Sequence, residues 1–251
     1  LEAEQVFNPF KFGFIGSSDN HNSTHVGEEN NYYGVSGLLD SDGQKRGSLP
    51  LDSVGENDGV YFDRYARFGA SGIAGVWAEQ NTRGSIYDAL RRKEAFGTSG
   101  PRIKIRFFAG NDLPDVDDRE LVAKSYAGGV SMGGNVITDR NEPATFIAWA
   151  AKDPNSAPLQ RLQIIKGWVQ NEQIYEKIYD VACADDMEID SISHRCADNN
   201  ASVSLEDCSI SSGLGAAELK SRWEDPEYDS AQHAFYYVRA IENPTCRWST
   251  W

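Results

Sequence analysis

The chain has 251 residues, 40% of them hydrophobic and 11% aromatic, which is enough to fill a folded core and excludes disorder as its main state. It contains 24 Lys and Arg and 38 Asp and Glu. The resulting formal net charge of -14 disfavours nucleic acid and anionic membrane surfaces as partners. The longest nearly apolar runs, such as residues 145–151, are far shorter than the ~20 residues of a membrane span.

The first residues lack a Met and a targeting pattern and lead quickly into a dense motif. We therefore expect this chain to be the C-terminal portion of a longer protein, with the N-terminal portion of the same protein as a partner.

An α/β pattern is expected in the first part of the chain. A strand is predicted at Phe12–Ile15, followed by a polar surface loop over Glu28–Gly59. Aromatic residues at helical spacing predict a short helix at Gly59–Phe68. The apolar run Gly72–Ala78 predicts a buried strand, and Ser85–Ala95 predicts a helix whose basic residues lie toward its C-terminal end. This order of elements is typical of an α/β fold.

Beyond Gly100-Pro101 the hydrophobic period changes to two, as in half-buried strands. Strands are predicted at Arg102–Phe108, Thr145–Trp149, Leu159–Gly167, Glu176–Ala182 and Ala234–Glu242. We place a domain boundary near residue 100, which gives an α/β unit over 1–100 and an all-β unit over 101–251. The second unit is expected to be an accessory antiparallel domain resembling a β-sandwich.

The four cysteines, Cys183, Cys196, Cys208 and Cys246, all lie in the last third of the chain and form no C-x-x-C pair. Two disulfides explain this arrangement better than a zinc site or free thiols, and they imply a periplasmic or secreted protein. Three pairings are open. We favour the nested one, Cys183 with Cys246 and Cys196 with Cys208, because it ties two strand ends together and closes a polar loop.

A candidate metal-binding motif follows the first predicted strand. The run Gly16-Ser17-Ser18-Asp19-Asn20-His21 presents a carboxylate and an imidazole two positions apart at a strand end. Asp19 and His21 are suitable ligands for Mn, Fe or Zn. A solvated polar turn is the alternative interpretation of the same residues.

The motif and four later regions resemble known families. Gly16 to His21, together with the helix and Thr-Gly-Pro-Arg-like turn at 89–102, resembles the last metal-binding motif of the polymerase and histidinol phosphatase (PHP) superfamily. The stretches 75–83, 158–167 and 235–248 are similar to the family called domain of unknown function 3604, a PHP-related group. This second resemblance covers nearly the whole chain.

The resemblance implies a metal-dependent hydrolase, with residues 1–100 as the C-terminal segment of a PHP-like distorted (β/α) barrel. Asp19 and His21 would bind a cluster of two or three divalent ions, Mn, Fe or Zn, completed by residues outside this chain. The implied activity is that of a phosphoesterase using a metal-activated water on a small-molecule phosphate or sulfate ester. The alternative function is a non-catalytic extracellular β-sandwich binding module with a degenerate barrel remnant.

Other polar residues have less specific interpretations. Arg83 could hold a phosphate or sulfate group bidentately beside Glu79, or Glu79 could cap the following helix and pair with Arg83. His25 could be a peripheral ligand or a substrate contact, or simply an exposed loop histidine. His194 and His233 are interpreted as surface or hydrogen-bonding histidines.

Overall fold

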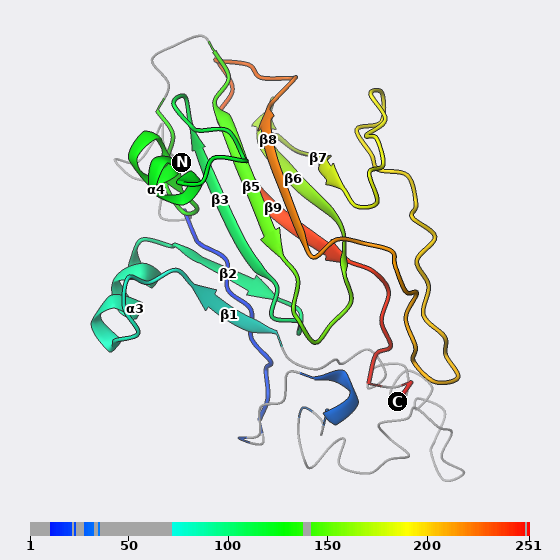
Figure 1. Cartoon of the computed structure of the whole chain (residues 1–251). Coiled ribbons are helices and arrows are strands. Elements are labelled where there is room, and N and C mark those ends of the chain that lie inside the picture. Colours follow the sequence, from blue (N-terminus) through cyan, green and yellow to red (C-terminus); the bar gives the residue numbers. More distant parts are fainter. Residues whose placement is uncertain are drawn as a thin grey trace.

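The computed structural model describes residues 11–21, 23, 28–32, 35, 72–137, 142–248 and 250–251. The predicted helix Gly59–Phe68, most of the predicted loop before it, and His25 lie outside the described residues. The described part is mostly β-sheet with few helices, as Figure 1 shows.

An antiparallel hairpin opens the long described segment. Strand β1 (Ile73–Val76) pairs with β2 (Ala95–Thr98), and helix α3 (Arg83–Arg91) lies between them in the chain. The helix begins after Thr82, whose hydroxyl accepts a hydrogen bond from the Ser85 amide at 3.3 Å and so caps the N-terminal turn.

Two further antiparallel sheets form the body of the molecule. One has the strand order β4-β3-β5-β8 and the other β7-β6-β9. Their strands are β3 (Lys104–Gly110), β4 (Val130–Ser131), β5 (Thr145–Ala151), β6 (Leu159–Gln170), β7 (Gln173–Cys183), β8 (Glu218–Glu224) and β9 (Ala234–Glu242). All the strand pairs found among the described residues are antiparallel.

One hydrophobic cluster joins the two sheets. It contains buried side chains from β3, β5 and β8 of the first sheet and from β6 and β7 of the second. Rings cross between the sheets, with Phe146 4.6 Å from Tyr236 and Tyr179 5.0 Å from Trp223, measured between ring centroids. The structure thus supports the predicted β-sandwich in part: it contains two antiparallel sheets that share one hydrophobic core.

The opposite face of the first sheet is covered by helix α4 (Leu121–Gly128) and the loop before it. Leu113 and Leu121 pack there against Phe108 and Ile147 in a second buried cluster. A polar contact reinforces this layer, because the hydroxyl of Tyr126 donates to the buried carboxylate of Glu94. Burial beside this carboxylate raises the pKa of Tyr126.

Several predicted elements need correction. Phe12–Ile15 is not a strand, because residues 12–15 join no strand ladder of the described structure. The predicted helix at Ser85–Ala95 ends at Arg91, and Ala95 instead begins β2. Helix α4 and strand β8 were not predicted. None of the described helices is long and apolar enough to cross a membrane.

All four cysteines are oxidised, as predicted, but the nested pairing is wrong. Cys183 bonds to Cys196, with 5.7 Å between their Cα atoms, and Cys208 bonds to Cys246 at 5.6 Å. The chain turns back after β7, and the segment before Cys196 returns to that strand, where the Asp180 amide donates to the His194 carbonyl at 2.9 Å and the Cys196 amide donates to the Asp180 carboxylate at 2.8 Å. The next loop carries Cys208 to the C-terminal segment instead.

Candidate functional site

The segment that carries the candidate metal ligands crosses the β1-β2 hairpin at three glycines. A Cβ atom on Gly97 would lie 2.6 Å from the Gly16 nitrogen, and one on Gly16 would lie 2.6 Å from the Ile73 carbonyl oxygen. A Cβ on Gly72 would lie 2.8 Å from the Ser17 carbonyl oxygen. Backbone therefore packs directly on backbone here, which only glycine permits. This crossing fixes the chain just before Asp19.

Substituting Gly97 by valine is expected to displace this segment and to lower the free energy of unfolding by about 1–3 kcal/mol through overpacking. Gly84→Ala is the control, because a Cβ on Gly84 of α3 would meet no atom within 4 Å. Hydrogen exchange of the amides at 15–17 should accelerate in Gly97→Val and stay unchanged in Gly84→Ala. Unchanged exchange in both variants would show that the crossing does not hold the segment.

The hairpin is itself fixed to the large sheet by stacked polar contacts. The indole nitrogen of Trp77 donates to the carbonyl of Ile105 at 2.7 Å, and the Arg106 guanidinium lies 3.6 Å from the centre of the Trp77 ring. Arg106 also donates to the Tyr126 hydroxyl at 3.2 Å. These contacts position the hairpin, and with it the crossing segment, relative to the core.

Asp19 and His21 lie side by side on the turn that follows the crossing. The Nε2 atom of His21 is 3.3 Å from Oδ1 of Asp19. The His21 side chain is 64% exposed and the Asp19 side chain is 90% exposed. Asp19 adopts a φ of 53° at this turn, and the turn is held by the His21 amide, which donates to the Val35 carbonyl at 2.8 Å. The two predicted ligands are thus brought together with their donor atoms available to a shared ligand.

The donor set suits a divalent cation in type but is too small to complete a site. A carboxylate oxygen and an imidazole nitrogen are suitable for Mn, Fe or Zn, whereas zinc alone takes four ligands. Within the described ranges, no group of three or more His, Cys, Asp or Glu side chains is placed to hold a metal ion. Asp19 and His21 thus supply two donors of a suitable type, and the described residues supply no third.

The C-terminal segment lies beside the short helix η1 (Glu29–Asn31) that follows this turn in the chain, at the lower edge of Figure 1. Glu29 accepts a hydrogen bond from the Trp248 amide at 2.8 Å and pairs with Arg247 at 2.9 Å. The rings of Tyr32 and Trp248 are 5.2 Å apart. Residues from both ends of the described chain thus meet here.

Glu79 and Arg83 are both exposed; Arg83 is the first residue of α3, and Glu79 lies in the loop before it. The predicted capping role of Glu79 is wrong, because Thr82 caps the helix. No ion pair between Glu79 and Arg83 is found in the described part of the chain, and their role as substrate contacts stays a prediction.

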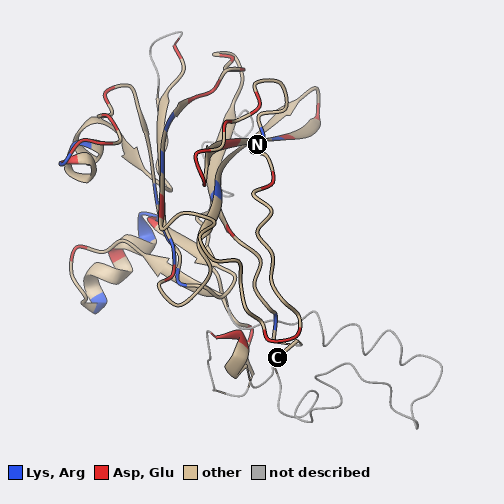
Figure 2. Cartoon of the chain, turned by 45° about the vertical axis from the view of Figure 1, so that its right-hand side comes forward, with Lys and Arg blue, Asp and Glu red and all other residues tan. Residues whose placement is uncertain are grey.

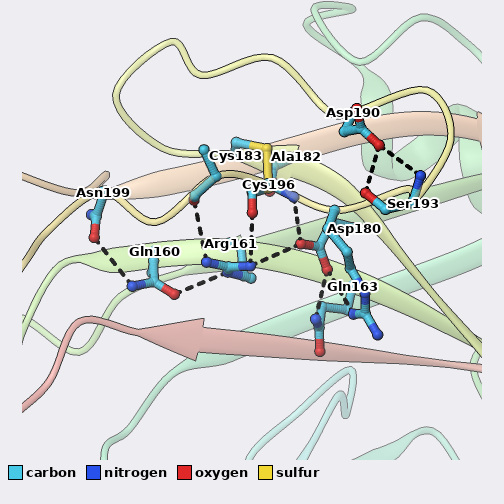
Figure 3. Close-up of polar contacts among 12 residues, drawn as sticks. Gln160, Arg161, Gln163, Asp180, Ala182, Cys183, Asp190, Ser193, Cys196 and Asn199 are labelled. Carbon is cyan, nitrogen blue, oxygen red and sulfur yellow. Dashed lines mark hydrogen bonds and ion pairs between the residues drawn. A yellow bond between two sulfur atoms is a disulfide. The ribbon is translucent and has the colours of Figure 1, made fainter.

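A polar network that sequence reasoning did not identify surrounds Asp180 on β7 (Figure 3). The Asp180 carboxylate is fully buried and accepts from Arg161 at 3.0 Å, from Gln163 at 2.6 Å and from the Cys196 amide at 2.8 Å. Each of these residues looks ordinary in the sequence, and only the strand register brings them together. A buried carboxylate with several donors is a rigid anchor for the loop closed by the Cys183–Cys196 disulfide.

His194 belongs to this loop, and its role is structural. Its backbone adopts a φ of 55°, and its carbonyl accepts from the Asp180 amide at 2.9 Å. Its ring lies 5.2 Å from Tyr179. His233 is exposed on the loop before β9.

The described residues thus define a β-rich, disulfide-bonded protein with an exposed Asp-His pair. A family model described as "Protein of unknown function (DUF3604)" matches residues 1–251, and the chain belongs to this family. No curated protein and no solved structure matches the chain significantly.

Proposed function

We propose that this chain is the C-terminal portion of a metal-dependent hydrolase, a phosphoesterase related to the PHP superfamily. The observation that carries the proposal is the Asp19–His21 pair, whose donor atoms lie 3.3 Å apart on a turn fixed by the glycine crossing. Divalent ions bound there, Mn, Fe or Zn, would activate water and stabilise charge on the attacking and leaving oxygens. Asp19 and His21 would hold and orient these ions.

The remaining ligands belong, in this proposal, to the N-terminal portion of the same protein. Residues 1–100 would form the last segment of a distorted barrel, and residues 101–251 an accessory β domain resembling a sandwich. The substrate would be a small-molecule phosphate or sulfate ester, with Arg83 and Glu79 as candidate contacts. Two disulfides are compatible with an extracellular protein, and we propose a periplasmic or secreted location.

Hydrolysis of 4-nitrophenyl phosphate and 4-nitrophenyl sulfate by the complete protein, loaded with Mn, Fe or Zn in turn, tests this function. Asp19→Ala and His21→Ala are each expected to lower turnover by about a hundredfold or more, because each removes a metal ligand. His233→Ala is the control, as it removes an exposed histidine elsewhere.

Equal activity in all three variants would refute the assignment of Asp19 and His21. A complete absence of hydrolysis with every metal would instead favour the second candidate, a non-catalytic binding module. The observation that favours that candidate is an exposed aromatic group: Phe14 and Phe235 are 59% and 57% exposed, and their rings lie 5.3 and 6.4 Å from the ring of Tyr237.

A further inference from the structure

Two aromatic rings lie side by side on the outer face of the β7-β6-β9 sheet. Phe235 and Tyr237 alternate along β9 with Tyr236 and Val238, which pack against the core, so the first two side chains lie on the opposite face. Their rings are nearly parallel, with an interplanar angle of 14° and 6.4 Å between the centroids. Phe235 is 57% exposed, so its exposed surface includes a ring face.

Both rings are next to residues of β6 that they help to cover. Gly167 is opposite Phe235 in the strand register, and a Cβ atom on Gly167 would lie 2.3 Å from Cζ of Phe235. The Phe235 ring thus occupies the space that a side chain of β6 would fill. Ile165, which is opposite Tyr237 and also points to the outer face, is 0% exposed. The rings therefore lie across the sheet and form a flat surface on it.

A third ring comes from the segment that crosses the β1-β2 hairpin. Phe14 is 59% exposed, and its ring centroid lies 5.3 Å from that of Tyr237 at an interplanar angle of 38°. Tyr237 is therefore the common neighbour of the two more exposed rings. Phe14, Phe235 and Tyr237 together are called the aromatic platform below.

One carboxylate and one guanidinium flank the aromatic platform. The Tyr237 hydroxyl donates to the exposed Glu176 carboxylate of β7 at 3.5 Å. Arg239 is two residues beyond Tyr237 on the same face of β9; it is exposed, and its Nε donates to the Gln163 amide oxygen at 2.8 Å. Burial and the Glu176 carboxylate raise the pKa of Tyr237, and Arg239 opposes this shift, so both charges lie near its ring. The two charges cancel.

These features suit a ligand with an apolar face and a rim of hydroxyl groups, which describes the pyranose ring of a sugar. Its C–H groups can pack on an aromatic ring face and bury apolar area. A hydroxyl both donates and accepts, so it can bind the Glu176 carboxylate or the Arg239 guanidinium. An apolar peptide segment would instead remove both charges from water without giving them partners.

The charge of the whole chain favours a neutral sugar over an anionic one. Acidic residues are spread over the loops and strand ends of the molecule (Figure 2), and the formal net charge is -14. A polyanionic glycan would be repelled by this field, whereas a neutral glycan is indifferent to it.

We propose that the aromatic platform binds a neutral oligosaccharide, with pyranose rings stacked on the aromatic faces and hydroxyls bound to Glu176 and Arg239. An open surface of several rings fits consecutive sugars of a chain. The site includes neither Asp19 nor His21 and needs no metal ion, so it goes beyond the proposed hydrolase activity. It also gives a ligand class to the alternative function, a binding module.

Calorimetric titration of the 251-residue chain with cellohexaose, xylohexaose, mannohexaose and maltohexaose, in the presence of a chelator, tests the site. We expect at least one of these neutral chains to bind with a Kd of about 1 mM or lower. Its affinity should be nearly independent of salt concentration, because no ligand charge is involved. The chelator excludes metal-mediated binding, so the result is independent of the hydrolase proposal. Hexagalacturonate, an anionic chain, should bind more weakly than the best neutral one.

Phe235→Ala should weaken binding about tenfold, because it removes a stacking face, and Phe14→Ala should also weaken it. Tyr87→Ala is the matched control, since it removes an aromatic ring that is 58% exposed on α3, and it should bind as the unmodified chain does. Thermal unfolding verifies that each variant is folded. Absence of binding by every neutral chain, tighter binding of hexagalacturonate, or an equal loss in Phe235→Ala and Tyr87→Ala would overturn the proposal.

Discussion

Replacing Asp225 by alanine is expected to lower the free energy of unfolding by about 3–5 kcal/mol, because it leaves a buried ammonium without its counter-charge. The side chains of Lys166 and Asp225 are 2% and 1% exposed, and their charged atoms are 2.6 Å apart. The same carboxylate accepts a hydrogen bond from the Tyr236 hydroxyl at 2.7 Å. After the substitution, Lys166 would keep only the Glu227 carbonyl, at 2.8 Å, as a close acceptor.

Urea denaturation followed by tryptophan fluorescence measures this loss. Asp229→Ala is the control, because this exposed aspartate caps only the Ala231 amide nearby, at 2.9 Å. Its effect should be about 1 kcal/mol or less. A double variant, Lys166→Met with Asp225→Leu, should recover much of the lost stability, since no charge is then buried. Equal stability of Asp225→Ala and Asp229→Ala would contradict this view of the core.

Removing the Cys208–Cys246 disulfide should have a comparably large effect on stability. The bond spans 38 residues, and the chain-entropy relation gives about 4 kcal/mol for a loop of this length. The Cys183–Cys196 disulfide spans 13 residues and should contribute about 3 kcal/mol.

Thermal unfolding of the two double variants, Cys208→Ala with Cys246→Ala and Cys183→Ala with Cys196→Ala, compares these contributions. Each should melt below the unmodified chain, with the first pair melting lower. Peptide mapping without reduction provides a separate check, because it should recover peptides linked through 183–196 and 208–246. Recovery of 183–246 and 196–208 peptides would contradict the observed pairing.

Several strands were predictable from the sequence. Ala234–Glu242 coincides with β9, and Thr145–Trp149 and Leu159–Gly167 lie within β5 and β6. The run in β5 is almost wholly apolar because both of its faces are covered: Phe146 and Ala148 belong to one buried cluster and Ile147 to the other. Strand β8, Glu218–Glu224, was missed because only Leu219 and Trp223 are apolar there. Its partner β5 supplies the pairing that its own residues do not indicate.

Apolar character alone led to a wrong prediction at two places, the segment that crosses the β1-β2 hairpin and the start of β2. Phe12–Ile15 has the composition of a strand, but the segment crosses other backbone at Gly97 and joins no ladder of the described residues. Ala95 and Phe96 continue the apolar pattern of the preceding helix. They nevertheless belong to strand β2, where they pair with Val76 and Gly75 of β1. Tertiary pairing overrides local propensity at such positions.

Some of the site residues could likewise be predicted from a local pattern, and others could not. The proximity of Asp19 and His21 could be predicted, because a short motif places both side chains on one turn. The Asp180 network could not, because it depends on an irregular register between Leu162 and Gln163 and on a loop that returns Arg195 to β7. The cysteine pairing depended on the path of the same loop. Contacts set by chain path and register leave no local pattern in a sequence.

The metal content of the complete protein, measured by inductively coupled plasma mass spectrometry after purification, tests the central proposal most directly. We expect stoichiometric Mn, Fe or Zn in the unmodified protein and a marked loss in Asp19→Ala and His21→Ala, with His233→Ala unchanged. These variants should retain the unfolding transition of the β-sheets, because Asp19 and His21 are exposed. Absence of stoichiometric metal from the unmodified protein, or equal metal content in all the variants, would contradict the assignment of Asp19 and His21 as metal ligands.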